Sequence, residues 1–384
     1  MEKNKKYVLI LLYLAFIALG LPDQLLGIAW PTMRLDFNKP LDAAGLSAFL
    51  VTILTSFSGY VNGYIALKYP VSKILTISVL LTAIGLLGYS LSPNWIIFLL
   101  FAVPLGIGAG SVDSSLNNYV AMNYSSKHMS WLHAFWGIGS TIGPLIMTGV
   151  FVFGANWRSG YGVVAFLLFM LTAVFALSRQ LWENSPANKP RENVKQNINI
   201  ISLNTFLSAS FFFFYTAVEG SVGLWIYSVM TEARNFNPIT AGTLVAIYWG
   251  SLTLGRIAVG FITKKYCDKQ IIITGLFISL GALFLMYLPY KITTAVSLVI
   301  LGAGLAGIYP CTMNETHKRY DLTTAQILMG HQVGAASLGF AIITPTVGFI
   351  IQRIGLNTLP IILTFFMIFL ISSELRLRKL NKNN

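Results

Sequence analysis

Charged residues are scarce in this chain, and their scarcity excludes a water-soluble fold. Only 10% of the 384 residues are charged, whereas 55% are hydrophobic; soluble domains carry roughly 25% charged residues. Apolar stretches of about twenty residues recur from end to end, and each is long enough to cross a hydrocarbon core of roughly 30 Å. The composition therefore predicts a polytopic, all-α membrane protein whose surroundings include a lipid bilayer.

Cysteine is also scarce, and several chemical signatures are missing altogether. Cys267 and Cys311 are the only two cysteines, too few for a disulfide framework or a metal cluster. We find no nucleophile–base pair and no phosphate-binding loop at a plausible spacing, so we expect no enzyme activity and no cofactor. The formal net charge is +13, but the basic residues form short clusters between apolar spans. We therefore expect no nucleic-acid partner.

Hydropathy and helix-breaking residues predict twelve membrane spans. The spans lie near residues 7–30, 43–67, 71–91, 95–122, 129–153, 158–182, 201–231, 239–262, 270–289, 293–314, 325–351 and 357–376. If both termini are cytoplasmic, the inside segments carry about 20 Lys and Arg, in line with the positive-inside rule. The outside segments carry only Arg34, Lys39, Arg158, Arg234, Lys291 and Arg353. This asymmetry predicts a multi-pass protein of the cell (inner) membrane.

An internal repeat divides the spans into two groups of six. A register shift of about 196 residues aligns Asp23 with Glu219 and Asn118 with Asn314, and a slightly larger one aligns His133 with His331. Six crossings return the chain to the same side, so the halves are parallel repeats related by an axis along the membrane normal. This is the major facilitator fold, two pseudo-symmetric six-helix bundles. The bundles comprise residues 1–182 and 201–384, joined by a polar cytoplasmic linker at 183–200.

Three of the acidic residues inside predicted spans are our candidates for cation coupling. A carboxylate in hydrocarbon costs on the order of 2.5–3.5 kcal/mol, so Asp23, Asp113 and Glu219 should face protein or water. In this fold the substrate lies near the midplane, and the first, fourth, seventh and tenth spans line its cavity. The alternative for each acid is a carboxyl that only holds helices together by hydrogen bonds.

Polar and aromatic residues within the predicted spans are the substrate-binding candidates. Asp113 and Asn117 are four residues apart and so share one helical face. The full set is Gln24, Asn117, Asn118, Trp136, Trp225, Tyr248, Trp249, Asn314, His133, His331 and Gln332. Amides would bind hydroxyl groups and an aromatic ring would stack on a sugar. Amides that only join helices, aromatics that fill the core and neutral histidines that bond a neighbouring helix are the alternatives.

Two motifs give the chain a family resemblance. The segments GIGAGSVDSSLNNYVAMNY and MSWLHAFWGIGSTIGPLI, with LPDQLLGIAW in the first span, resemble the fucose-proton symporter family of the major facilitator superfamily, which includes sodium-dependent glucose transporters. The resemblance implies sugar uptake coupled to a cation, with Asp23 and Asp113 as coupling groups. The glycines of these segments let helices approach closely and slide.

The usual gating motif of the superfamily is incomplete in this chain. No acid follows Gly63 in the loop between the second and third spans. The second half keeps more of the pattern around Arg256 and Lys264, and Glu315 lies beside Lys318. We take Arg256, Glu315 and Lys264 as gating candidates, with a solvated Glu315 as the alternative.

The sequence thus predicts a monomeric secondary transporter that couples sugar symport to protons or sodium ions by alternating access. Two alternatives stand beside this hypothesis. A proton-coupled exporter of amphipathic drugs or lipids would have a broadly apolar cavity, whereas the fourth span here is rich in amides. A non-transporting sensor or scaffold with the same fold would tolerate loss of the acids.

Overall fold

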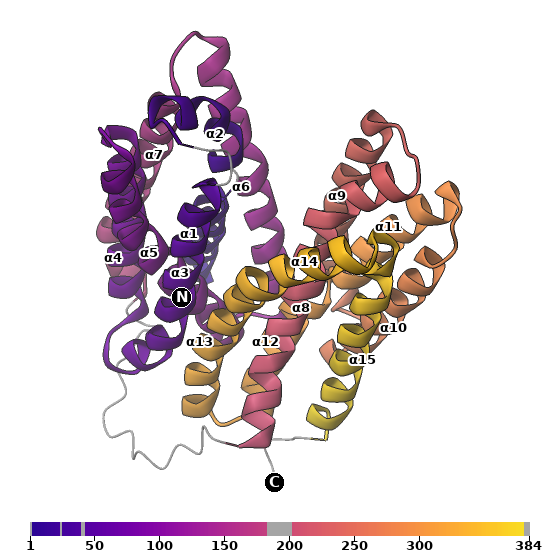
Figure 1. Ribbon diagram of the computed structural model, residues 1–384. Coiled ribbons are helices and arrows are strands. Elements are labelled where there is room, and N and C mark those ends of the chain that lie inside the picture. Colours follow the sequence, from indigo (N-terminus) through magenta and orange to yellow (C-terminus); the bar gives the residue numbers. More distant parts are fainter. Residues whose placement is uncertain (1, 24, 40–42, 183–201, 380–384) are drawn as a thin grey trace. The chain divides into compact units, whose positions relative to one another are not determined.

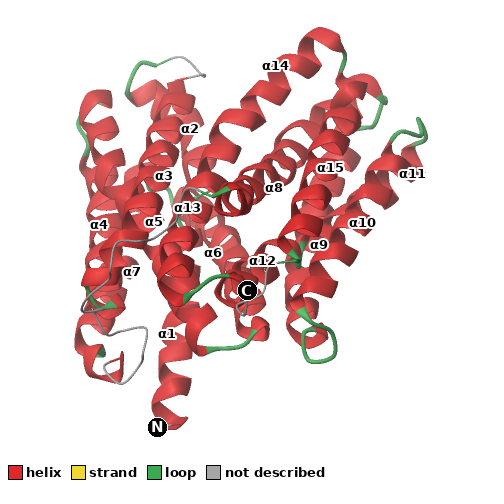
Figure 2. Ribbon diagram, turned by 90° about the horizontal axis from the view of Figure 1, so that it is seen from below, coloured by secondary structure: helices red, strands yellow, loops and turns green. Residues whose placement is uncertain are grey.

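The computed structural model describes residues 2–23, 25–39, 43–182 and 202–379. These residues are almost entirely helical, and none of them lies in a strand (Figures 1 and 2). Twelve helical runs within them are long and apolar enough to cross a membrane. The predicted all-α class with twelve membrane-spanning helices is therefore confirmed.

The helices alternate with short connections along both halves of the chain. The first half holds α1 (Glu2–Gly20), α2 (Leu25–Asp36), α3 (Ala44–Lys68), α4 (Val71–Leu91), α5 (Trp95–Asn123), α6 (Ser126–Val152) and α7 (Trp157–Leu177). The second half holds α8 (Leu203–Ser228), α9 (Pro238–Ile262), α10 (Asp268–Met286), α11 (Lys291–Leu305), α12 (Ile308–Arg319), α13 (Leu322–Leu338), α14 (Thr344–Ile354) and α15 (Leu359–Leu377).

Several spans are interrupted where the sequence predicted continuous helices. The first span breaks between α1 and α2 around Pro22, which has no N–H to continue the helical hydrogen bonds. The tenth span breaks between α11 and α12, just before Gly307. A π-helical segment, Gly339–Ile343, joins α13 to α14 in the eleventh span. Such interruptions are frequent at functional sites, and the first one holds Asp23.

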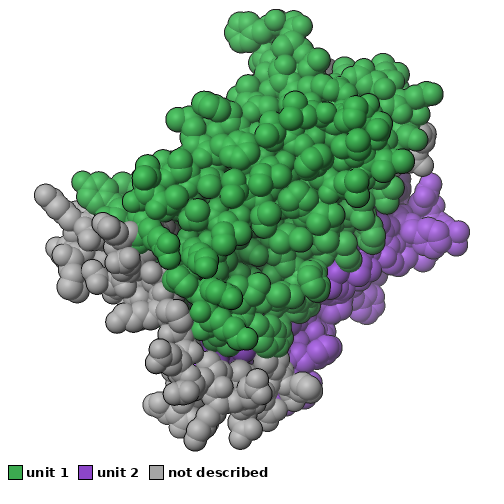
Figure 3. All heavy atoms as spheres, turned by 90° about the vertical axis from the view of Figure 1, so that its left-hand side faces the viewer, with its two compact units in different colours: residues 1–123, 135–196, 329–334 green, residues 124–134, 197–328, 335–384 purple. Residues whose placement is uncertain are grey.

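The chain forms two compact units (Figure 3). Unit 1 comprises residues 1–123, 135–196 and 329–334, and unit 2 comprises 124–134, 197–328 and 335–384. These units follow the predicted halves except at two short segments. The beginning of α6 groups with the second half, and the middle of α13 groups with the first half. The two exchanged segments contain His133 and His331, which the repeat aligns.

Glycines bring the helices of unit 1 into backbone contact. A Cβ atom on Gly108 of α5 would overlap the backbone of α4, and one on Gly110 would overlap the carbonyl oxygen of Thr55 in α3. Small residues allow this approach because apolar helices gain nothing from the hydrophobic effect when they associate inside a bilayer. The GIGAG glycines therefore fix how tightly α5 packs between its neighbours.

We predict opposite effects for two glycine-to-alanine substitutions. Gly110→Ala should destabilise the protein by roughly 1–3 kcal/mol because the added methyl group has no room. Gly149→Ala in α6 is the matched control, since a Cβ there meets nothing within 4 Å. It should be neutral or stabilising by up to about 1 kcal/mol. Thermal unfolding in detergent measures both, and equal melting temperatures for the two variants would contradict this packing.

Candidate functional site

The break in the first span packs tightly against α6 within unit 1. A Cβ atom on Gly139 or Gly143 of α6 would overlap a backbone carbonyl oxygen of the first span, and one on Gly20 would overlap the backbone of α6. This close approach allows the indole Nε1 of Trp136 to donate a hydrogen bond to Oδ2 of Asp23, at 2.8 Å. The glycines of GIGSTIGP thus hold a predicted substrate residue against a predicted coupling residue.

A second carboxyl group of unit 1 is held within α5. Nδ2 of Asn117 donates to Oδ1 of Asp113 at 2.7 Å and to the Asp113 carbonyl oxygen at 3.0 Å. Asn117 and Asn118 are both buried. Gln24, also predicted to bind substrate, lies outside the described residues.

Asp23 and Asp113 have no basic partner among the residues that the structure describes. Within the described residues, no Lys, Arg or His side chain forms an ion pair with Asp23 or Asp113 at 4.0 Å or less. Each acid instead receives a hydrogen bond from a neutral N–H group. Because an uncompensated charge in a membrane-spanning helix is costly, these two acids are the candidates for neutralisation by a bound proton or small cation.

The third intramembrane acid has a different environment, in unit 2. Oε1 of Glu219 in α8 lies 3.0 Å from a guanidinium nitrogen of Arg256 in α9, and the two side chains are only 12% and 4% exposed. The hydroxyl group of Tyr248 donates to the Glu219 carbonyl oxygen at 3.3 Å. Glu219, predicted as a coupling residue, and Arg256, predicted as a gating residue, thus neutralise each other inside unit 2.

Two tryptophans of unit 2 pack against helices. Trp225 donates from Nε1 to the carbonyl oxygen of Thr344 at 2.8 Å. Its ring lies so close to Gly348 that a Cβ atom on this glycine would overlap the ring. Trp249 covers Gly223 in the same way. Both rings thus hold α8 against its neighbours, which matches the core-filling alternative as well as the predicted contact with substrate.

The two repeat-aligned histidines pack against tyrosines. His133 lies edge-on to Tyr309, with 4.9 Å between ring centroids, in unit 2. His331 lies against Tyr60 in unit 1, at 5.1 Å. Its neighbour Gln332 is fully buried. These residues lie at contacts between helices, and their role in substrate binding stays a prediction.

A buried polar network surrounds Asp268 at the start of α10. Its Oδ2 accepts hydrogen bonds from Ser126 Oγ at 2.7 Å, Asn314 Nδ2 at 2.6 Å and Lys318 Nζ at 2.7 Å. Asn314 also donates to Ser126 at 2.7 Å. Asn314, predicted to bind substrate, therefore joins α12 to two other segments of unit 2.

The same network continues through the predicted gating residue Glu315. Its Oε1 lies 2.8 Å from Lys318 Nζ, and its other oxygen lies 3.7 Å from Arg319. Arg319 donates to both oxygens of Glu374 in α15 at 2.6 and 2.9 Å. Glu315 is 2% exposed, so the ion-paired interpretation fits it better than the solvated one. Lys264, the remaining gating candidate, is exposed.

Sequence reasoning missed two acids of this network. Asp268 stands just before a predicted span, where nothing in the sequence indicates burial. Glu374 lies inside the predicted last span. An ionisable residue in a membrane segment is a functional candidate by default, so Glu374 should have been a candidate as well. Nothing in the sequence pairs Glu374 with Arg319, 55 residues earlier.

Known proteins resemble this chain along most of its length. The model of the Major Facilitator Superfamily matches residues 12–321. The glucose/mannose transporter GlcP of Bacillus subtilis is 22% identical, over 96% of this chain and 94% of GlcP. Human sodium-dependent glucose transporter 1 is 21% identical, over 77% of this chain and 64% of its own length.

A solved structure shares the fold. A variant of the fucose:proton symporter FucP of E. coli superimposes with a TM-score of 0.77 over 97% of this chain and 98% of FucP, at 13% identity. This low identity shows similarity of fold alone. The family model, however, spans well over half of the residues. The chain therefore belongs to the Major Facilitator Superfamily and is a multi-pass membrane transporter with twelve membrane-spanning helices.

Proposed function

We propose that this protein is a secondary active transporter that couples the movement of a sugar to that of a proton or sodium ion. The named substrates of GlcP, of the human transporter and of FucP are all sugars, and two of these names include a cation. The protein alternates access between the two sides of the membrane, and only its empty or doubly loaded form changes conformation.

The observation that carries the proposal is the contrast between the acids of the two units. Glu219 has a permanent counter-charge in Arg256. Asp23 and Asp113 have only neutral hydrogen-bond donors, Trp136 and Asn117. A mobile cation that binds these two carboxyl groups lowers the cost of holding them inside the bilayer while the protein changes conformation. Glu219 is consequently the weakest of the three coupling candidates.

The residues around the two acids suit a hydroxylated substrate. Asn117 and Asn118 carry amide groups, which can bind hydroxyls at the edge of a sugar once a change of conformation exposes them. The Trp136 ring offers an apolar face for its C–H groups. Because Trp136 also donates to Asp23, a cation that neutralises Asp23 weakens this charge-assisted hydrogen bond and frees the ring to shift. Trp136 therefore links the cation to the sugar.

The energetics of such coupling are sufficient. One charge that moves through 100 mV contributes about 2.3 kcal/mol. Tenfold accumulation of a neutral sugar requires about 1.4 kcal/mol. A membrane potential of this size therefore supports roughly 40-fold accumulation for each cation transported.

Uptake of radiolabelled glucose, mannose and fucose into proteoliposomes tests the proposal. Under an imposed proton or sodium gradient with an inside-negative potential, the wild type should concentrate one of these sugars. Asp23→Asn and Asp113→Asn replace a carboxylate with a neutral side chain, which does not need the cation. Each variant should lose accumulation while it still exchanges internal for external sugar.

Glu232→Gln is the control, since Glu232 is an exposed acid in the π-helical segment after α8 and should leave accumulation unchanged. Absence of sugar uptake under either gradient would refute the sugar proposal and favour an exporter of amphipathic compounds. Accumulation that persists in both aspartate variants would keep the sugar but remove these carboxyl groups from coupling.

We also propose that the transporter is a monomer of the cell (inner) membrane with both termini in the cytoplasm. The positive-inside asymmetry of the connecting segments supports this orientation. In the same orientation the network around Asp268 and Glu315 lies at the cytoplasmic ends of its helices, where we propose that it acts as a gate together with Lys264.

The two native cysteines provide a test of orientation. Cys267 is exposed just before α10, whereas Cys311 is buried. A membrane-impermeant maleimide should therefore label the protein in inverted membrane vesicles and not in right-side-out vesicles. Cys267→Ser should abolish the labelling, because Cys311 is inaccessible. Labelling of right-side-out vesicles would show that the termini face outward.

A further inference from the structure

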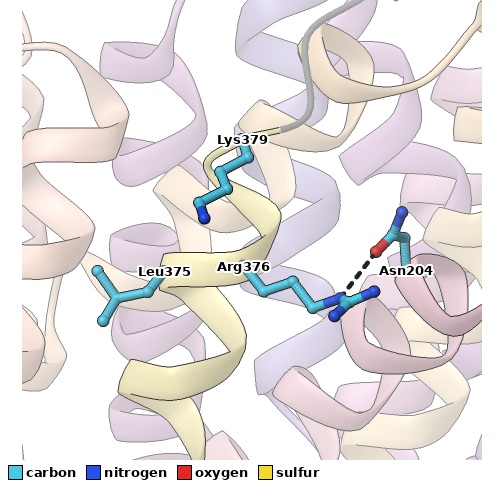
Figure 4. A pocket seen from close by; sticks show the side chains of 4 residues that line it. All are labelled: Asn204, Leu375, Arg376 and Lys379. Carbon is cyan, nitrogen blue, oxygen red and sulfur yellow. Dashed lines mark hydrogen bonds between the residues drawn. The ribbon is translucent and has the colours of Figure 1, made fainter.

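A surface depression of about 520 Å³ lies where α8 begins and α15 ends in unit 2. Asn204, Leu375, Arg376 and Lys379 line it (Figure 4). Arg376 extends toward Asn204 of α8, and its Nε donates to Oδ1 of Asn204 at 3.3 Å. Lys379 lies just past the end of α15. None of the four residues belongs to the site around Asp23 and Asp113.

The depression carries positive charge, and the part of the chain that the structure describes supplies no counter-charge to it. Within the described residues, neither Arg376 nor Lys379 forms an ion pair. Glu374 is the nearest acid in the sequence, but its side chain is fully buried and is bound by Arg319 on the inner side of α15. Arg376 and Lys379 themselves are exposed. Their charges are therefore available to an anion from outside the protein.

Exposed apolar side chains adjoin the lining residues along α8 and α15. Leu375 is 48% exposed beside them, and Leu203 and Phe206 in the first turn of α8 are 55% and 67% exposed. The last membrane-spanning run ends at Leu377, so Arg376 and Lys379 stand at the boundary of the hydrocarbon region. A soluble anion would match the cations alone. A molecule with both an anionic head and hydrocarbon chains would match the whole surface.

We propose that this depression binds an anionic phospholipid. The phosphate group lies between the Arg376 guanidinium and the Lys379 ammonium, while Asn204 holds Arg376 in position. The acyl chains extend along Leu375, Leu203 and Phe206. Such a lipid joins the beginning of α8 to the end of α15 and so stabilises unit 2. This inference does not depend on which substrate the protein transports.

Titration of the purified full-length protein with a short-chain phosphatidylglycerol, followed by thermal unfolding, tests the proposal. We expect a saturable rise in melting temperature that the zwitterionic phosphatidylcholine does not give. In the double variant Arg376→Gln, Lys379→Gln, the apparent affinity for phosphatidylglycerol should fall about 30-fold, as expected for loss of two basic residues at a membrane surface.

Lys68→Gln, Lys73→Gln is the matched control, because it removes the same charge from exposed lysines of unit 1 and should bind as the wild type does. The charge-preserving Arg376→Lys should retain most of the affinity, and equal melting temperatures in phosphatidylcholine establish that each variant is folded. An unchanged response in the double glutamine variant would overturn the proposal. Glycerol 1-phosphate or inorganic phosphate that reproduces the shift would show a site for soluble phosphate and would overturn it as well.

Discussion

The cost of an unpaired charge in hydrocarbon is the constraint on which the rest of this structure depends. Unit 2 meets it with internal partners, since Glu219 binds Arg256 and Glu374 binds Arg319. Unit 1 holds Asp23 and Asp113 with neutral donors only. Two homologous halves thus solve the same electrostatic problem in different ways. Glu219 and Glu374 in unit 2 have internal counter-charges, and the two acids in unit 1 are those that we propose to bind a mobile cation.

Backbone contact at glycines makes this arrangement possible. The glycines of α6 allow the interrupted first span to approach so closely that Trp136 reaches Asp23. A Cβ atom at these positions would overlap backbone carbonyl oxygens of the first span, so a larger residue would force the two helices to shift. Close packing by small residues therefore determines where Asp23 is placed.

Much of the fold followed from local properties of the sequence. Hydropathy predicted the twelve spans because each span must bury its backbone polar groups in its own helix. The proline at position 22 indicated that the helix could break there. The position of this break beside α6 depends on glycines more than a hundred residues away. The pairing of Asp113 with Asn117 was predictable because the two are four residues apart on one helix.

The partners of the other acids could not be predicted in this way. Glu219 and Arg256 are on different helices, and no periodic pattern relates them. The roles of Asn314 and Trp225 also depend on contacts that arise only when distant helices pack, so the sequence could not distinguish a substrate ligand from a residue that holds helices together. Residue type identified the candidates, and tertiary contacts separated acids with a counter-charge from acids without one.

The most direct test of the central claim is to measure whether an imposed sugar gradient moves the cation across the membrane. In proteoliposomes without any ion gradient, an inward gradient of the transported sugar should carry protons or sodium ions inward, measured with an internal pH dye or with radioactive sodium. Thermodynamic reciprocity requires this movement if Asp23 and Asp113 couple the two fluxes. Sugar that equilibrates across the membrane without movement of either cation would contradict the account, because the two carboxyl groups would then need no mobile cation for transport.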